Sequence, residues 1–263
     1  MGMKRSILIL GIGLLLFAGC IDYTEKVLCP SYVIAYLGLS EIELSDKYSG
    51  DNCIYLYGHS DPAYSEFCNV ESTGEREELY MSLGQKHNDI SYNRKRLLDH
   101  RTIIMDPGYY NCDLLSISVT ADRDIDEAHP AGTDLGDIVR FMSWSPYRYI
   151  QSGYSKYYHY DRSDVSAAFD TMMQVYFDEK WFDNETDATC YPVDKLVKDL
   201  TADDLVLLGH DSPGLIGMLY FEKMPDADRF SIAVSIGTDD GRTLCDTLTI
   251  PEPIDKGIDR SRR

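Results

Sequence analysis

Two alternating segments joined by a turn near the C-terminus constrain the fold more than any other feature of the sequence. Between residues 230 and 237, apolar Phe, Ile and Val alternate with Ser, Ala and Gly. Residues 243–250 are rich in Thr and other β-branched residues, and the link between the segments contains Asp240-Gly241, which is typical of tight turns. Because successive side chains of a strand point to opposite faces, this pattern predicts a β-hairpin with one face in a core and one in water.

The remaining patterns predict a mainly β chain with few helices. Further strands are expected over residues 31–39, 42–44, 114–120 and 215–222. Helices are expected over residues 72–83, 134–142 and 164–177, the first from the capping-box pattern Ser72-x-x-Glu75. Residues 46–101 are polar and indicate a long insertion. We therefore expect a β-sandwich of the immunoglobulin-like or transthyretin-like type, with one or two short helices and this insertion.

The N-terminal twenty residues have the pattern of a processing signal. Lys4 and Arg5 precede an apolar run from Ile7 to Ala18, which is shorter than the roughly twenty residues that span a membrane. Small residues then lead into Cys20, an order that resembles the bacterial lipobox. In signals of this kind a peptidase cuts before the cysteine, which receives acyl chains such as palmitate. We expect residues 1–19 to be a signal peptide and Cys20 to be lipidated.

This signal predicts the domain organisation and the location. Residues 20–26 would form a lipidated tether, residues 27–250 a single domain, and residues 251–263 a flexible tail. Acyl chains would hold the protein in the outer membrane, with the body at the cell surface or in the periplasm. The formal net charge of −19 argues against a nucleic-acid partner and predicts that an anionic lipid surface repels the acidic body.

Cysteine usage is consistent with an exported chain. Apart from Cys20, the cysteines are Cys29, Cys53, Cys68, Cys112, Cys190 and Cys245. An even number in an exported protein suggests disulfides, and the sequence leaves the pairing open. Cys53 and Cys68 are the nearest pair along the chain and are the candidate disulfide.

Two stretches together resemble a family of lipoproteins. These are SISVTADRDIDEAHPAGTDLGD over residues 116–137 and FSIAVSIGTDDGRTL over residues 230–244. With the lipobox, they resemble uncharacterised lipoproteins of gut-type anaerobic Gram-negative bacteria, over about a third of the chain. The resemblance implies an outer-membrane lipoprotein with a β-sandwich body and carries no assigned activity.

The first of these stretches contains the best metal candidate. Asp122, Asp124 and Asp126 alternate along the chain and offer oxygen ligands to Ca²⁺, although the EF-hand pattern fails because Glu127 occupies the position of its glycine. The alternative is a solvated loop without a cofactor. The acids here, together with His129, are also the basis for a hydrolase hypothesis.

Tyrosines gather in a short segment that is the candidate binding surface. Its members are Tyr147, Tyr149, Tyr154, Tyr157, Tyr158 and Tyr160. Rings with polar edges suit stacking on a glycan or contact with a protein. The alternative is a β-hairpin whose tyrosines cover the sandwich. Our leading hypothesis is a non-enzymatic interaction or structural module of the cell envelope, bound to an envelope or host protein. The alternatives are a glycan-binding accessory surface lipoprotein and a secreted hydrolase.

Overall fold

The computed structural model shows a mainly β protein, which confirms the fold class at this level. The strands of the described residues belong to four separate sheets, and none of these sheets closes on itself. Of the helices in the described ranges, none has the length and apolar character required to cross a membrane. The structure describes residues 24–46, 52–60, 67–99, 108–159, 162–176, 189–209, 214–227 and 229–250.

The largest sheet has five antiparallel strands in the order β10-β9-β11-β4-β3. In chain order they are β3 (Glu41–Ser45), β4 (Cys53–His59), β9 (Val139–Ser145), β10 (Tyr191–Leu196) and β11 (Leu215–Phe221). Strands β3 and β11 confirm the strands expected over residues 42–44 and 215–222.

A second, three-stranded sheet has the order β13-β12-β8 and is also antiparallel. Its strands are β8 (Leu114–Ala121), β12 (Phe230–Thr238) and β13 (Thr243–Ile250). The predicted C-terminal hairpin is therefore confirmed. Residues of β12 alternate between buried and half-buried along its whole length. In the turn, Gly241 has a φ of +84°, which glycine adopts without steric cost.

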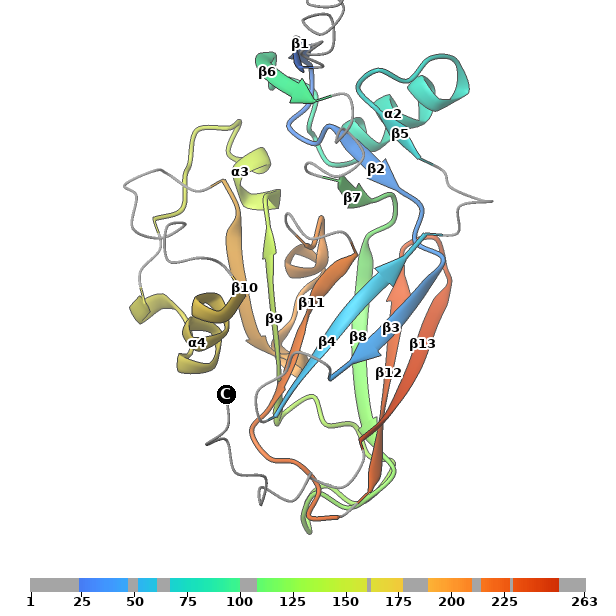
Figure 1. Ribbon diagram of the computed structural model, residues 1–263, viewed down its shortest axis with the longest axis vertical. Coiled ribbons are helices and arrows are strands. Elements are labelled where there is room, and N and C mark those ends of the chain that lie inside the picture. The colour runs from blue at the N-terminus through green and yellow to red at the C-terminus, as the bar shows by residue number, and fades with distance from the viewer. Residues whose placement is uncertain are drawn as a thin grey trace, which may run out of the picture.

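The two larger sheets share one apolar cluster, whose burial supplies the main driving force for folding. Fully buried members from both sheets include Val119, Phe141, Leu219, Ile232 and Ile236. At the edge, the backbone N–H of Leu44 on β3 donates a hydrogen bond to Asp246 Oδ2 on β13 at 2.7 Å. The edges of the two sheets are thus joined, with the apolar cluster between them (Figure 1).

The end of the molecule that carries the first strand is built from smaller pieces (Figure 1). A two-stranded antiparallel ribbon pairs β1 (Thr24–Cys29) with β6 (Arg94–Asp99). A small sheet of order β5-β2-β7 consists of β2 (Ala35–Leu37), β5 (Cys68–Asn69) and β7 (Gly108–Tyr110). The helices are α2 (Glu75–Lys86), α3 (Tyr147–Gln151) and α4 (Ala167–Tyr176), with 3-10 turns at Arg162–Asp164, Val197–Asp199 and Ala202–Leu205.

The sequence predicts that the polar segment 46–101 is an insertion outside the β core, and the structure shows otherwise. It contains β4, which pairs with both β3 and β11 inside the five-stranded sheet. Ile54 and Leu56 of this strand are fully buried. The strand is short and polar residues precede and follow it, so the average composition of the segment does not reveal it.

The prediction of a helix over residues 134–142 is also wrong, because β9 begins at Val139. The helix expected over 72–83 exists but begins later, at Glu75, with Gly74 as its N-cap. Ser72 is not a cap, since its hydroxyl donates to Asn69 Oδ1 at 3.1 Å. Helix α4 confirms the helix over 164–177, while only Ala35–Leu37 of the 31–39 stretch is a strand.

Candidate functional site

The tyrosine segment forms a short helix and a loop rather than a β-hairpin. Strand β9 ends at Ser145, and Pro146, whose fixed φ suits a helix start, precedes α3. The Ser145 hydroxyl accepts a hydrogen bond from the N–H of Tyr147 at 3.1 Å. After the helix, Gly153 and Tyr154 both have positive φ values, and the chain turns back over the ring of Tyr149.

Two of the six tyrosines are core residues and cannot present their rings to a ligand. Tyr149 is 1% exposed and Tyr154 is 5% exposed, and their ring centroids lie 5.8 Å apart in a T-shaped pair. Tyr32 and Tyr92, from distant parts of the chain, extend this layer by edge contacts with Tyr149 and Tyr154, respectively. Of the other candidates, Tyr147, Tyr157 and Tyr158 are half-buried, and Tyr160 lies outside the described residues.

A fully buried carboxylate fixes the tyrosine layer. Asp89 has no exposed surface, and its Oδ1 accepts hydrogen bonds from the N–H of Tyr32 at 2.7 Å and the hydroxyl of Tyr154 at 2.8 Å. Its Oδ2 accepts from the N–H of Val33 at 2.9 Å. Burial raises the pKa of Asp89 although these three hydrogen bonds oppose the shift. The carboxylate therefore joins three segments that are far apart in sequence.

Arg94 covers this layer with an exposed guanidinium. Its Nη1 donates to the hydroxyls of Tyr149 and Tyr157, each at 3.2 Å, and its Nη2 donates to the carbonyl of Tyr154 at 3.2 Å. Its Cζ lies 5.1 Å from the ring centroid of Tyr92. Within the described part of the chain Arg94 forms no ion pair, so tyrosine oxygens orient the cation without neutralising it.

Arg96, two residues along β6, is held in the same way. Its Nη1 donates to the carbonyl of Tyr32 at 3.0 Å, and its Cζ lies 5.6 Å from the Tyr32 ring centroid. We call Tyr92, Arg94, Arg96 and Tyr157 the tyrosine–arginine surface. It combines rigid rings with two oriented guanidinium groups, which suits hydrogen bonding to carboxylate, phosphate or hydroxyl oxygens of a partner.

A second group of rings lies beside α3. Tyr158 contacts Tyr191 at 5.4 Å and Trp144 at 6.3 Å between ring centroids. The guanidinium of Arg148 lies 5.9 Å from the Tyr191 ring, and its side chain is 60% exposed. This group contains Tyr158, a member of the candidate surface, together with rings from β9 and β10.

The three aspartates proposed for Ca²⁺ each serve the backbone of their own loop or of a neighbouring strand. Asp122 accepts from the N–H of Ser231 at 2.7 Å, and Asp124 accepts from the N–H of Ala131 at 2.7 Å. Asp126 accepts from the N–H of Ala128 at 3.0 Å. Among the residues that the structure describes, no group of three metal-ligating side chains is gathered at one place. The calcium site remains a sequence prediction, and the geometry gives the three carboxylates another role.

His129 is held between two carboxylates in the same loop. Its Nδ1 lies 2.7 Å from Asp126 Oδ1, and its Nε2 lies 3.1 Å from Asp137 Oδ1. The hydrogen bond to Asp126 raises the pKa of His129, with Asp137 adding to the effect. With both ring nitrogens engaged, His129 ties the loop together and is not positioned as a general base.

The end of β4 contacts the chain just before β11. Gly58 is the penultimate residue of β4, and its N–H donates to the carbonyl of Gly214, just before β11, at 2.6 Å. The hydroxyl of Tyr110 donates to the carbonyl of Gly58 at 2.7 Å. His210 and Ser212 lie outside the described residues, and His59 pairs with Glu43 at 2.6 Å.

A polar network outside the tyrosine layer joins α2 to the hairpin turn. His87 Nε2 lies 3.0 Å from Asp113 Oδ1, and Lys86 Nζ lies 2.8 Å from Asp113 Oδ2 and 2.6 Å from Asp239 Oδ2. Burial acts to raise the pKa of Asp113, but hydrogen bonds from His87 and Lys86 outweigh it and hold that pKa below its usual value. His87 is only 2% exposed, so the His–Asp pair supports the fold rather than facing a ligand.

The structure records no disulfide bond among the described cysteines. Cys53 starts β4 in the five-stranded sheet, whereas Cys68 is buried in β5 of the small sheet. Burial raises the pKa of the Cys53 thiol to about 12. The Cys53–Cys68 disulfide therefore stays a sequence prediction.

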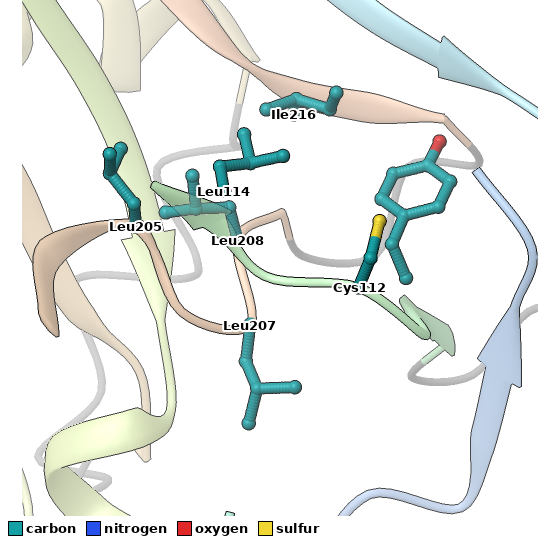
Figure 2. A pocket seen from close by; sticks show the side chains of 7 residues that line it. Cys112, Leu114, Leu205, Leu207, Leu208 and Ile216 are labelled. Atoms are coloured by element: carbon teal, nitrogen blue, oxygen red, sulfur yellow. The ribbon is translucent and has the colours of Figure 1, made fainter. Parts of the chain in front are cut away.

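A small cavity lies beside the apolar cluster that the two larger sheets share (Figure 2). Its volume is about 10 Å³, room for at most one water molecule. Burial raises the pKa of the Cys112 thiol beside it to about 11, so the thiol stays protonated near neutral pH. The lining residues are Tyr110, Cys112, Leu114, Leu205, Leu207, Leu208 and Ile216.

Comparison with known proteins gives no relative, since no protein-family model, curated protein or solved structure matches this chain.

Proposed function

We propose that this chain is a lipid-anchored protein of the bacterial outer membrane that acts as an interaction module, binding an envelope or host protein through the tyrosine–arginine surface. The observation that carries the proposal is the exposed Arg94 guanidinium, oriented by Tyr149, Tyr154 and Tyr157. The lipobox-like segment that ends at Cys20 supports the anchor.

The chemistry of the surface supports recognition of a protein. Tyr and Arg are enriched among the residues that carry most of the binding energy of protein interfaces. Because hydrogen bonds to Tyr149, Tyr154 and Tyr157 already hold the Arg94 guanidinium, this side chain loses little freedom on binding. The two larger sheets on one apolar cluster support a β-sandwich interpretation of the body, in which the sheets act as a rigid scaffold.

The anchor is tested by expressing the full chain in a Gram-negative host with an alkyne-bearing palmitate. We expect the chain to carry the label and to sediment with the outer membrane. The Cys20→Ala variant should lack the label and be found in the soluble fraction. An unlabelled wild-type chain would overturn the anchor.

The interaction is tested by pull-down from envelope extracts, with quantitative mass spectrometry of wild type, Arg94→Ala and Tyr157→Ala. A true partner should be depleted by at least about tenfold with either variant. Lys198→Ala, an exposed cation outside the surface, is the matched control and should retain the partner. If all four proteins recover the partner equally, the tyrosine–arginine surface is not the binding surface.

A glycan is the second candidate partner, favoured by the half-buried rings of Tyr157, Tyr158 and Tyr191 with Arg148 beside them. Such rings stack on sugar faces while the guanidinium donates to hydroxyl groups. Isothermal titration with polysaccharides tests this, and Tyr157→Ala and Tyr158→Ala should abolish binding while leaving the thermal unfolding transition in place. No heat of binding with any polysaccharide would exclude the glycan.

A further inference from the structure

The β1–β6 ribbon has one buried face and one exposed face. Cys29 is fully buried and Val27 is half-buried, packed near Ile34 on the inner side. Since side chains alternate along a strand, Lys26 and Leu28 point the opposite way. Leu28 is 56% exposed, the largest exposure among the large apolar side chains that the structure describes.

Cations surround the exposed leucine. Leu28 stands opposite Lys95 in the ladder, so these two side chains share the outer face with Lys26, and both lysines are exposed. The two strands together contain Lys26, Arg94, Lys95 and Arg96 against the acids Glu25 and Asp99. The ribbon is therefore net positive in a chain whose formal net charge is −19.

The position of the ribbon in the chain limits how far it lies from the proposed anchor. Strand β1 begins at Thr24, four residues after Cys20. A fully extended chain covers at most about 3.6 Å per residue, so these four residues span at most about 14 Å. A body tethered at Cys20 must therefore hold this end, rather than the loop at residues 122–138, next to the lipid (Figure 1).

We propose that the outer face of the β1–β6 ribbon rests on the anionic leaflet that holds the anchor, with Lys26 and Lys95 on phosphate groups and Leu28 inserted among the headgroups. The inference rests on lipidation at Cys20. Lysines attract anionic lipid while their stems lie along apolar surface, and an exposed leucine between them enters the interface. The acidic remainder of the body is repelled and stands away from the bilayer, so only this ribbon makes contact.

The test uses the full lipidated chain in phosphatidylethanolamine–phosphatidylglycerol vesicles. A polarity-sensitive fluorophore is attached at Leu28→Cys in a Cys245→Ser background, since Cys245 is the exposed thiol. We expect a blue-shifted emission that nitroxide-labelled lipids quench. The same label at Arg123→Cys, on the loop at the other end, should stay unshifted and unquenched.

Charge reversal tests the lysines. Lys26→Glu with Lys95→Glu should abolish the quenching at position 28, because each cation near an anionic surface changes the contact equilibrium about fivefold. Lys198→Glu with Lys223→Glu makes the same charge change elsewhere and should leave the quenching intact. Vesicles of phosphatidylcholine alone, which carry no net charge, should abolish the quenching at position 28 as the charge reversal does.

Vesicle flotation distinguishes a failure of the lipid anchor at Cys20 from a failure of the ribbon contact with the lipid. Chains that fail to float with the vesicles would refute the anchor. Chains that float, but whose label at position 28 is quenched no more than the label at position 123, would overturn the ribbon contact and leave the anchor standing.

Discussion

Replacing Asp89 with alanine should destabilise the fold by about 3–5 kcal/mol. The carboxylate accepts hydrogen bonds from the N–H groups of Tyr32 and Val33 and from the hydroxyl of Tyr154, and all four residues are buried. Each buried donor left without an acceptor costs about 1–3 kcal/mol. The total is reduced because removing the carboxylate also ends the desolvation cost that raises the pKa of Asp89.

Urea unfolding followed by tyrosine fluorescence measures this change. Asp226→Ala removes a carboxylate at an exposed position and should stay within about 0.5 kcal/mol of wild type. Asp89→Asn keeps one acceptor oxygen and should lie between the two. A loss below about 1 kcal/mol for Asp89→Ala would refute the view that this carboxylate satisfies three buried donors.

Three further predictions concern the polar network and the core. Because His87 and Lys86 lower the pKa of Asp113, the ionised carboxylate contributes its full stabilisation of the fold above about pH 4. This contribution is lost as the pH falls through the lowered pKa that Asp113 has in the folded state. Asp113→Asn should remove this part of the acid sensitivity, which is measured as the unfolding midpoint against pH. Gly217→Ala would place a Cβ 2.7 Å from the Phe141 ring and should cost about 1–3 kcal/mol by urea unfolding, an unchanged midpoint contradicting the close approach. Phe141→Ala should cost about 3–5 kcal/mol and shift the thermal midpoint downward, and an unshifted midpoint would contradict its full burial.

The strands that the sequence predicts are those with one face in the core and one in water. β12 alternates in burial over its whole length, and this alternation can be seen in its residues. β9 is buried on both faces, since Phe141 belongs to the shared core while Met142 and Trp144 pack with Phe169 of α4. A strand of this kind has no period of two, so residues 134–142 suggested a helix instead.

The candidate surface could be predicted in part. The density of tyrosines over residues 147–160 indicates an aromatic cluster, but local density does not show which rings are buried. That depends on Asp89 and Arg94, which reach Tyr149 and Tyr154 from more than fifty residues away along the chain. Arg94 stands in a short basic run, Arg94-Lys95-Arg96, which does not show that tyrosines surround it. A lone buried aspartate such as Asp89 leaves no pattern in a single sequence.

The hydrogen bonds of Asp89 also decide how the protein responds to mechanical force. With the proposed lipid anchor at Cys20, a pull from the membrane would travel along β1 and reach the body at Tyr32 and Val33, whose N–H groups both donate to this carboxylate. The buried hydrogen bonds of Asp89 therefore resist tension on the tether before that tension reaches either large sheet. Under shear at the bilayer, the β1–β6 ribbon would separate from the rest of the protein first. The two larger sheets would stay folded until the hydrogen bonds of Asp89 break.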